Sequence, residues 1–353
     1  MKKLNFYLIS ILLSASIIIF SCGGTETKEQ VAEQVAVNET QILVDYLESN
    51  GNFINSKKVP AMIKSKEVHS NLENPKYLVI DIRGTSDFKK GHIANAENVK
   101  MKDLIIYFEN EITPSDYEKI ALVCYSGQTA SFSTSVLRLL GYNNVYAMKW
   151  GMASWAMPYG DKWLSHVSND YAEQLITDVA PKAAVSALPV LSTGLSNGKA
   201  ILKTRAKEVL SLKFKTVLVK APELFDNGTA YYINNYWPLA KYEAGHVPGA
   251  IQYQPKKSLD TKADLLTLPT DKKIVTYCFT GQHSAFVTAY LRVLGYDAYS
   301  LSFGANSFMN GQLQENGKGW HAFTKDAVHD FEIVKEAIEE GSEGDVEEEA
   351  SCG

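Results

Sequence analysis

The feature that most constrains this chain is a seven-residue segment that occurs twice, at residues 124–130 and 278–284. Its pattern is Cys, an aromatic residue, a hydroxyl residue, Gly, Gln, any residue and a small residue. Each copy follows a short apolar run, at 120–123 and 274–277, of the kind that forms a buried strand. Each copy precedes a helical pattern that ends at a glycine, as helices often do. The sequence therefore predicts that both cysteines lie at strand-to-helix turns.

The two copies belong to a longer internal repeat with an offset of 154 residues. At this offset Arg138 corresponds to Arg292, and Gly91-His92 corresponds to Gly245-His246. A repeat of this length indicates two whole domains rather than a short-period solenoid. A chain of 353 residues has room for two domains of about 100–150 residues each.

Strand-like and helical patterns alternate within each copy. Residues 77–80 form a continuous apolar run that ends at Asp81, as another run ends at Cys124. This alternation predicts α/β domains, each with a central, mainly parallel sheet flanked by helices. Reactive groups in such domains lie at the carboxyl ends of the strands, which is where Asp81, Arg83 and Cys124 fall.

Composition and pattern divide the chain into six segments. The tail has Phe331, Val334 and Ile338 at helical spacing, followed by an acidic stretch. Cys352 lies just after that stretch. The predicted segments are a signal peptide at 1–22, a flexible tether at 23–41, domain 1 at 42–166, a connector with one or two short helices at 167–209, domain 2 at 210–325, and a helical, then acidic and disordered tail at 326–353.

The N-terminus has the pattern of a targeting segment. Lys2 and Lys3 precede an apolar run at residues 6–20, which is short for a membrane span. The following Ser-Cys-Gly resembles the cleavage site of bacterial lipoproteins. The resemblance implies that Cys22 becomes the lipidated first residue of a protein tethered to a membrane of the cell envelope, on the periplasmic or outer-membrane side. An ordinary signal peptide or an uncleaved anchor is the alternative.

Charge and ligand spacing argue against two other classes of partner. The net charge is −5, and no stripe of Lys and Arg appears, so nucleic acid is not an expected partner. The sequence lacks the paired Cys/His spacing of metal sites, so we expect no metal and no other cofactor.

A cysteine at the start of a helix is in a place that favours a thiolate. The first backbone N–H groups of a helix have no partner within it and point into the preceding loop. Such groups lower the pKa of a cysteine from its usual value of about 8.5. We therefore predict that Cys124 and Cys278 are reactive. The residues predicted to form their substrate-binding loops are Tyr125, Ser126, Gly127, Gln128 and Thr129, and Phe279, Thr280, Gly281, Gln282 and His283.

Several ordered motifs resemble the signature of the rhodanese domain. They are Val79-Ile80-Asp81-Ile82-Arg83, Gly91-His92-Ile93, the loop from Cys124 to Thr129, and Tyr242 to Ile251 in the second copy. The resemblance spans roughly residues 55–165 and 210–322. It implies two rhodanese-like domains and a sulfurtransferase whose cysteine carries a persulfide. The implied donor is thiosulfate or a low-molecular-weight persulfide, and the implied acceptor is a thiol or cyanide.

The second copy departs from the first at two supporting positions. Asp81 and Arg83 are expected to form an ion pair that braces the first loop. Their counterparts are Asn235 and Trp237, so the second copy lacks this pair. We therefore predict that Cys124 is the more competent site. The second loop instead contains His283, which we expect to titrate near neutral pH.

Two other classes of function are alternatives to a sulfurtransferase. The first is a rhodanese-like binding or sensor module on the cell envelope, without turnover. The second is a phosphatase or arsenate reductase, whose cysteine loop is one residue longer and closes with an arginine. Ala130 and Ser284 stand in the closing region here, which disfavours the second class.

Overall fold

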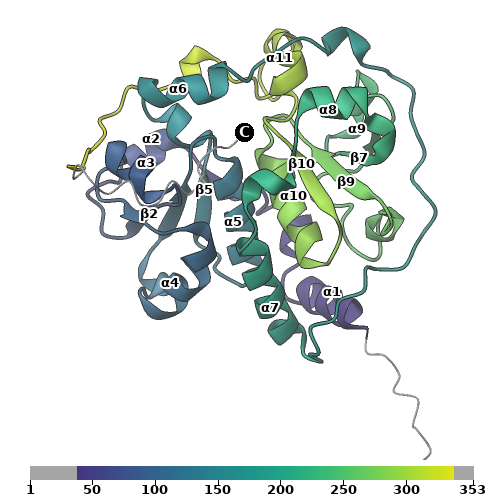
Figure 1. Ribbon diagram of the computed structural model, residues 1–353, viewed down its shortest axis with the longest axis horizontal. Helices are drawn as coiled ribbons and strands as arrows, with labels where there is room; N and C mark the ends of the chain where they lie inside the picture. The colour runs from purple at the N-terminus through teal and green to yellow at the C-terminus, as the bar shows by residue number, and fades with distance from the viewer. Residues whose placement is uncertain (1–37, 338–353) are drawn as a thin grey trace, which may run out of the picture. The chain divides into compact units, whose positions relative to one another are not determined.

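The computed structural model describes residues 38–337 of this chain, and these residues build two parallel β-sheets (Figure 1). Each sheet has five strands, in the order β1-β5-β4-β2-β3 and β6-β10-β9-β7-β8. All of the strand pairs in both sheets are parallel. The predicted fold class, two α/β units with a central parallel sheet flanked by helices, is confirmed.

The two units use corresponding elements in the same order, except that α4 of domain 1 has no α-helical counterpart in domain 2. Domain 1 has strands β1 (Met62–Ile63), β2 (Tyr77–Asp81), β3 (Glu97–Asn98), β4 (Lys119–Val123) and β5 (Val145–Met148), with helices α1 (Glu39–Ser49), α2 (Ser65–His69), α3 (Thr85–Lys90), α4 (Leu104–Asn110), α5 (Gln128–Leu139) and α6 (Met157–Leu164). Domain 2 has strands β6 (Leu218–Val219), β7 (Tyr231–Asn235), β8 (Ile251–Gln252), β9 (Lys273–Tyr277) and β10 (Ala298–Leu301), with helices α7 (Gly198–Leu210), α8 (Ala221–Asp226), α9 (Leu239–Glu243), α10 (Gln282–Val293) and α11 (Asn306–Glu315).

Alternate residues of the strands pack into different cores, because successive side chains of a strand point to opposite faces. Ile120 and Leu122 of β4 join the core that contains α4 and α5. Ala121 and Val123 join a separate core with α2 and the segment after β5. The first of these cores continues into domain 2 through α10, whereas the outer face of the second sheet has its own core.

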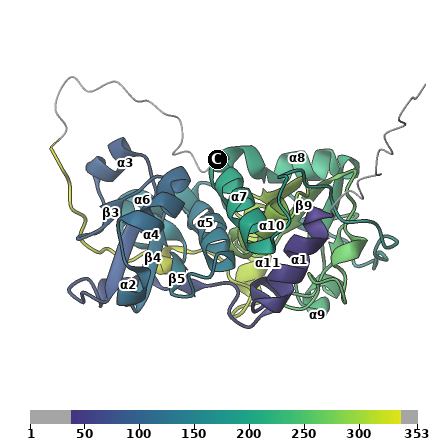
Figure 2. The same cartoon turned by 90° about the horizontal axis from the view of Figure 1, so that it is seen from below.

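Helices α5 and α10 pack against each other where the two domains meet, and both views place them side by side (Figures 1 and 2). Small residues on α5 fit this close packing. Ser135 Oγ, for example, donates a hydrogen bond to Phe286 O of α10 at 2.8 Å. Each helix begins directly after one of the two cysteine loops, so the packing brings the loops of both domains to the same interface.

Each domain is followed by a segment that crosses to the other domain. The first crossing segment, residues 166–178, forms an antiparallel bridge between Ile176 and His246 of domain 2. The second, residues 321–337, forms the matching bridge between Val334 and His92 of domain 1. All four backbone hydrogen bonds of the two bridges are 2.9 Å long. The exchange is therefore reciprocal.

The second crossing segment differs from the helix predicted for the start of the tail. Residues 328–337 form no helix, and their one regular feature is the bridge at Val334. Their backbone bonds to domain 1, as Phe331 N donates to Trp155 O at 3.0 Å. The Phe331 ring stacks on His69 at 3.9 Å. These tertiary contacts outweigh the helical spacing of the apolar residues, because such spacing is only a local preference.

Some sequence predictions fall outside the described residues. These are the signal peptide, the lipidation site Cys22, most of the tether, the acidic stretch and Cys352. Across residues 38–337, the helices are all too short or too polar to cross a membrane.

Candidate active site

Cys124 lies between the end of β4 and the start of α5, as its position in the sequence predicted. Its Sγ accepts hydrogen bonds from the backbone N–H groups of Gly127, at 3.1 Å, and Ala130, at 3.3 Å. The turn depends on Gly127, which has a left-handed φ of +82° that glycine adopts without a steric cost. Backbone donors aimed at a sulfur atom stabilise its anionic form.

The segment after β5 holds this loop from behind. Met152 N donates to Cys124 O at 2.8 Å, and Ala153 N donates to Tyr125 O at 3.0 Å. The indole Nε1 of Trp163 donates to Ser126 O at 3.0 Å. Because the loop carbonyls are bound on this side, the loop N–H groups are free to face the sulfur.

Cys278 occupies the equivalent turn between β9 and α10. Its Sγ accepts a hydrogen bond from Ser284 N at 3.2 Å. Two hydroxyl groups are also near the sulfur: Ser284 Oγ at 3.6 Å and Thr280 Oγ1 at 4.0 Å. The carbonyls of this loop are held as in domain 1, with Ala305 N donating to Cys278 O at 2.9 Å. Each cysteine is only 3% exposed.

A buried ion pair stands beside the first loop. Arg83 Nη2 lies 2.6 Å from Asp81 Oδ2, and both side chains are 1% exposed. Burial by itself lowers the pKa of Arg83, but the hydrogen bonds and negative charge of Asp81 outweigh burial and raise that pKa. The guanidinium also donates to Gly91 O at 2.7 Å and lies over the Tyr125 ring, 4.8 Å from its centroid. Arg83 thus links the end of β2 to the loop.

Domain 2 braces its loop with neutral groups. Asn235 Nδ2 donates to Tyr277 Oη at 2.6 Å, and Asn235 Oδ1 accepts from Trp237 N at 3.1 Å. The Trp237 ring stacks on Phe279, with centroids 4.6 Å apart and an angle of 5° between the planes. Lys241 Nζ lies over the same phenyl ring at 4.6 Å. The surroundings of this loop are therefore aromatic, where those of the domain 1 loop include a buried ion pair.

The predicted loop residues divide into two groups by where their side chains lie. Tyr125 and Phe279 line the mouths, next to Arg83 and Trp237 respectively. Ser126 and the two glutamines are completely buried. Ser126 Oγ accepts from Gln128 Nε2 at 3.1 Å. Both glutamine side chains reach the opposite domain. Thr129 and Thr280 are at least partly covered by the protein.

The expectation that His283 titrates near neutral pH is wrong. Burial, together with the smaller effect of the positive charge of Lys256, lowers the pKa of His283 to about 3. Its Nε2 is buried without a hydrogen-bond partner among the described residues, and the ring meets that of Tyr236 edge-on at 5.0 Å. A neutral imidazole at this position does not supply a charge to Cys278. Sequence alone gave the residue but not its burial.

Several contributors to the site were not expected from the sequence. They are Ser284 and Ser300, whose hydroxyl groups are 2.8 Å apart beside Cys278, Trp163 behind the first loop, and Tyr277 beneath Asn235. Ser284 and Tyr277 differ from their domain 1 counterparts, Ala130 and Val123. A comparison of the two copies was the signal that would have identified them.

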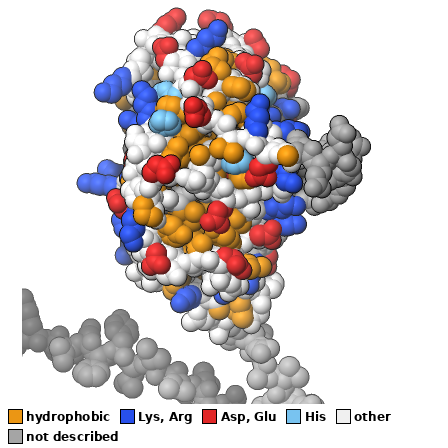
Figure 3. All heavy atoms as spheres, turned by 90° about the vertical axis from the view of Figure 1, so that its left-hand side faces the viewer, with side chains coloured by type: hydrophobic (Ala, Val, Ile, Leu, Met, Phe, Trp, Pro, Cys, Tyr) orange, Lys and Arg blue, Asp and Glu red, His pale blue; other side chains and the backbone are white. Residues whose placement is uncertain are grey.

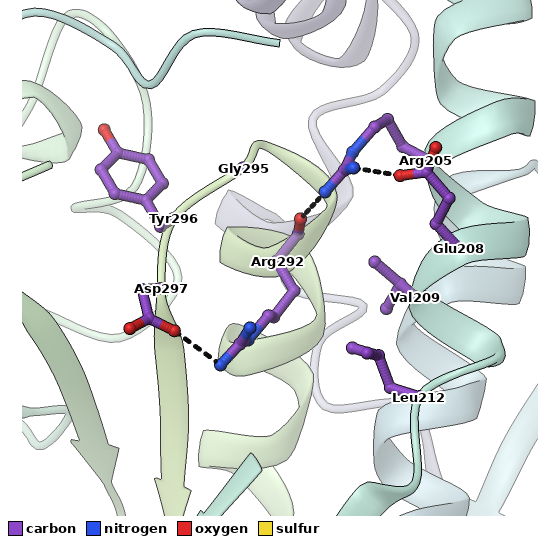
Figure 4. A pocket seen from close by; sticks show the side chains of 8 residues that line it. All are labelled: Arg205, Glu208, Val209, Leu212, Arg292, Gly295, Tyr296 and Asp297. Carbon is purple, nitrogen blue, oxygen red and sulfur yellow. Dashed lines mark hydrogen bonds and ion pairs between the residues drawn. The ribbon is translucent and has the colours of Figure 1, made fainter. Parts of the chain in front are cut away.

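The described residues also form two cavities away from the sulfur atoms. One, of about 260 Å³, lies near the far end of α10, about 15 Å along the helix from its start. Its two arginines are already paired, Arg292 with Asp297 and Arg205 with Glu208 (Figure 4). The other, of about 420 Å³, includes His321, whose ring centroid is 5.8 Å from that of Phe279. Only the second adjoins a cysteine loop.

Neither the surface charge nor the arrangement of possible metal ligands points to a further site among residues 38–337. On the side of domain 1 that Figure 3 shows, acidic and basic side chains are interspersed rather than grouped by sign. No group of three or more His, Cys, Asp or Glu residues within 38–337 is arranged to hold a metal ion.

Comparison with known proteins shows which class of domain the two units are similar to. The family model for the Rhodanese-like domain matches residues 64–158 and 235–310. These segments include both cysteine loops and most of both sheets. The two parallel-sheet units of this chain therefore match tandem rhodanese-like domains.

Individual relatives are similar over limited parts of the chain. The thiosulfate sulfurtransferase GlpE of Pseudoalteromonas translucida is 27% identical over 92 residues, which is 26% of this chain and 84% of that protein. A tRNA uridine(34) hydroxylase of Buchnera aphidicola is 28% identical over 104 residues, which is 29% of this chain and 32% of the hydroxylase. The 3-mercaptopyruvate sulfotransferase SseA of Escherichia coli is 16% identical, with a TM-score of 0.24, over 68% of this chain and 97% of SseA.

Proposed function

We propose that this protein is a sulfurtransferase that moves a sulfane sulfur through a persulfide on Cys124, and also on Cys278. The observation that carries the proposal is the Cys124 turn, where backbone N–H groups of Gly127 and Ala130 point at Sγ from 3.1 and 3.3 Å. The rhodanese-like family match and the similarity to a protein named as a thiosulfate sulfurtransferase support it.

The chemistry takes place in two displacements. In the first, the cysteine thiolate attacks the outer sulfur of thiosulfate or of a low-molecular-weight persulfide. A new S–S bond forms on the cysteine, the S–S bond of the donor breaks, and sulfite or a thiolate leaves with the electron pair. In the second, a thiolate or cyanide attacks the outer sulfur of the enzyme persulfide and releases the cysteine as a thiolate. No external oxidant or reductant is needed.

The loop geometry suits both displacements. The N–H groups that contact Sγ stabilise the thiolate before attack and after release, and they need not rearrange as charge develops. A persulfide is also an anion, so donors at the start of the helix favour it as well. The proposal is tested by transfer of sulfur from thiosulfate or glutathione persulfide to cyanide. Activity that persists when both cysteines are replaced by serine would refute it.

A second candidate is a binding or sensor module without turnover, favoured for domain 2 by one observation. In domain 2 the Asn235–Tyr277 contact and the Trp237–Phe279 stack stand where domain 1 has its ion pair. A single-turnover experiment separates the two functions. A persulfide that forms on Cys278 and resists both a thiol and cyanide would favour the sensor.

We also propose that the mature protein is tethered to a membrane of the cell envelope through a lipid on Cys22. The basic start, the apolar run and the Ser-Cys-Gly junction support this proposal. Labelling of cells with a palmitate analogue should mark the wild type and spare Cys22→Ala. Equal labelling of both would rule it out.

A further inference from the structure

The glutamine of each cysteine loop bonds to the opposite domain. Gln128 Oε1 accepts a hydrogen bond from Phe303 N at 2.8 Å, and Gln282 Oε1 accepts one from Trp150 N at 3.4 Å. The two donating residues, Phe303 and Trp150, have a left-handed backbone, with φ of +59° and +66°. This conformation is unfavourable for large side chains and persists only where the surroundings hold it.

Trp150 and Phe303 each belong to a turn that packs against the cysteine loop of their own domain. In domain 1 the next residue is Gly151, where an added Cβ would lie 2.3 Å from Cys124 O and 2.6 Å from Gly127 N. In domain 2 the next residue is Gly304, where a Cβ would lie 2.4 Å from Cys278 O. A displacement of either turn would therefore move a cysteine loop.

The glutamine amides also touch the loop glycines of the opposite domain directly. A Cβ on Gly127 would lie 2.2 Å from Gln282 Nε2, and a Cβ on Gly281 would lie 2.3 Å from Gln128 Oε1. Each loop is thus enclosed between its own turn and the glutamine of the other domain. The two glutamines and the two loop glycines are all buried, so water does not replace these contacts.

We propose that Gln128 and Gln282 are positioning residues that act across the interface, each on the cysteine of the other domain. Gln282 holds the Trp150 turn, whose following residues Met152 and Ala153 bind the loop carbonyls of domain 1. The loop N–H groups then stay on Cys124. Gln128 does the same for Cys278 through Phe303. The proposal rests on the proposed function only in taking the two cysteines as the reactive groups.

The test is the rate at which iodoacetamide alkylates each cysteine, followed by peptide mass spectrometry in the full-length chain. Gln282→Met keeps the length of the side chain and removes its only described side-chain hydrogen bond, which is to domain 1. We expect it to slow alkylation of Cys124 at pH 6 by about twofold to tenfold, the effect of one hydrogen bond. Cys278, although it is in the same domain as the substitution, should change less than Cys124.

Gln128→Met should show the reverse pattern and a larger effect, because its bond to Phe303 N is shorter. Gln128 also contacts Ser126 within its own loop. Ser126→Ala removes only contacts within that loop and is the matched control, expected to affect Cys124 and not Cys278. If the glutamines act by positioning the N–H groups, their substitution should slow alkylation more at pH 6 than at pH 9. At pH 9 a thiol of ordinary pKa is already largely ionised.

The crossed pattern decides the question, and it does so without measuring sulfur transfer. Slower alkylation of the cysteine in the opposite domain, greatest at pH 6, would establish the proposal even if neither cysteine transferred sulfur. Slower alkylation confined to the cysteine of the substituted domain would overturn it. An equal loss at both cysteines that is the same at pH 6 and pH 9 would also overturn it, because it would indicate general loosening of the fold.

Discussion

The two domains hold the same cysteine turn with different chemistry. In domain 1 the end of the neighbouring strand carries a buried ion pair, Asp81 with Arg83, which reaches the loop through Tyr125. In domain 2 the same strand end carries Asn235, which bonds to Tyr277, and Trp237, which stacks on Phe279.

The comparison shows which parts of the brace are interchangeable. One side-chain oxygen at the strand end has the same role in both domains. Asp81 Oδ1 accepts a hydrogen bond from Arg83 N at 3.0 Å, and Asn235 Oδ1 accepts one from Trp237 N at 3.1 Å. The link from the strand to the loop is made by a cation over an aromatic ring in one domain and by two stacked rings in the other. Support of the loop therefore does not require charge.

The largest expected effect comes from breaking the ion pair. Arg83→Met leaves the Asp81 carboxylate buried without its cation, and we expect a loss of about 3–5 kcal/mol in the free energy of unfolding. Urea titration followed by circular dichroism measures it. The double variant Asp81→Asn/Arg83→Met removes both charges and should recover part of the loss. A double variant less stable than Arg83→Met would contradict the account.

The next prediction compares the two cysteines in turnover. Cys124→Ser should lower sulfur transfer to cyanide by about a hundredfold, the lower end of the range for losing a preorganised donor, and Cys278→Ser should lower it less. The reason is that the ion pair fixes the first loop before the donor arrives. If Cys278→Ser removes most of the activity with small and bulky donors alike, the assignment of the better site is wrong.

A smaller effect should follow from exchanging the residue that closes the loop. Ser284 Oγ lies 3.6 Å from the sulfur of Cys278, whereas Ala130 offers no hydroxyl group at this position. Ser284→Ala should slow alkylation of Cys278 by about twofold to tenfold, the range for one typical hydrogen bond. Ala130→Ser is the reciprocal variant and should speed alkylation of Cys124. No change in either rate would show that the hydroxyl group does not act on the sulfur.

The smallest predicted effect concerns pH. Because burial lowers the pKa of His283 from 6.5 to about 3, the unfolded chain binds a proton between these values and the folded chain does not. This contribution to stability is complete above pH 6.5 and is lost as the pH falls toward 3. His283→Thr, which copies Thr129 of domain 1, should therefore lose less stability than the wild type between pH 7 and pH 4.5. An equal loss would mean that His283 is protonated in the folded protein.

Much of the fold was predictable because it rests on local patterns that occur twice. The apolar runs before Cys124 and Cys278 and the helical patterns after them are enough to place both turns and a parallel sheet. The Asp81–Arg83 pair was also predictable, since both residues lie at one strand end and have opposite charges.

The rest depends on contacts between residues far apart in the chain. Gln128 and Phe303 are 175 residues apart, and nothing in either segment indicates that they meet. The same holds for the segment around Val334. Its apolar spacing predicts a helix, but its backbone pairs with His92 of domain 1. The pKa of His283 was misjudged for the same reason, because burial is a property of the assembled domains.

The most direct test of the central claim is the intact mass of the protein after exposure to thiosulfate or glutathione persulfide. The account predicts a gain of one sulfur atom at Cys124 and one at Cys278. Each gain should disappear with the corresponding serine substitution and reverse on addition of cyanide. Absence of any gain at these two cysteines, or a gain that persists when both are serine, would contradict it.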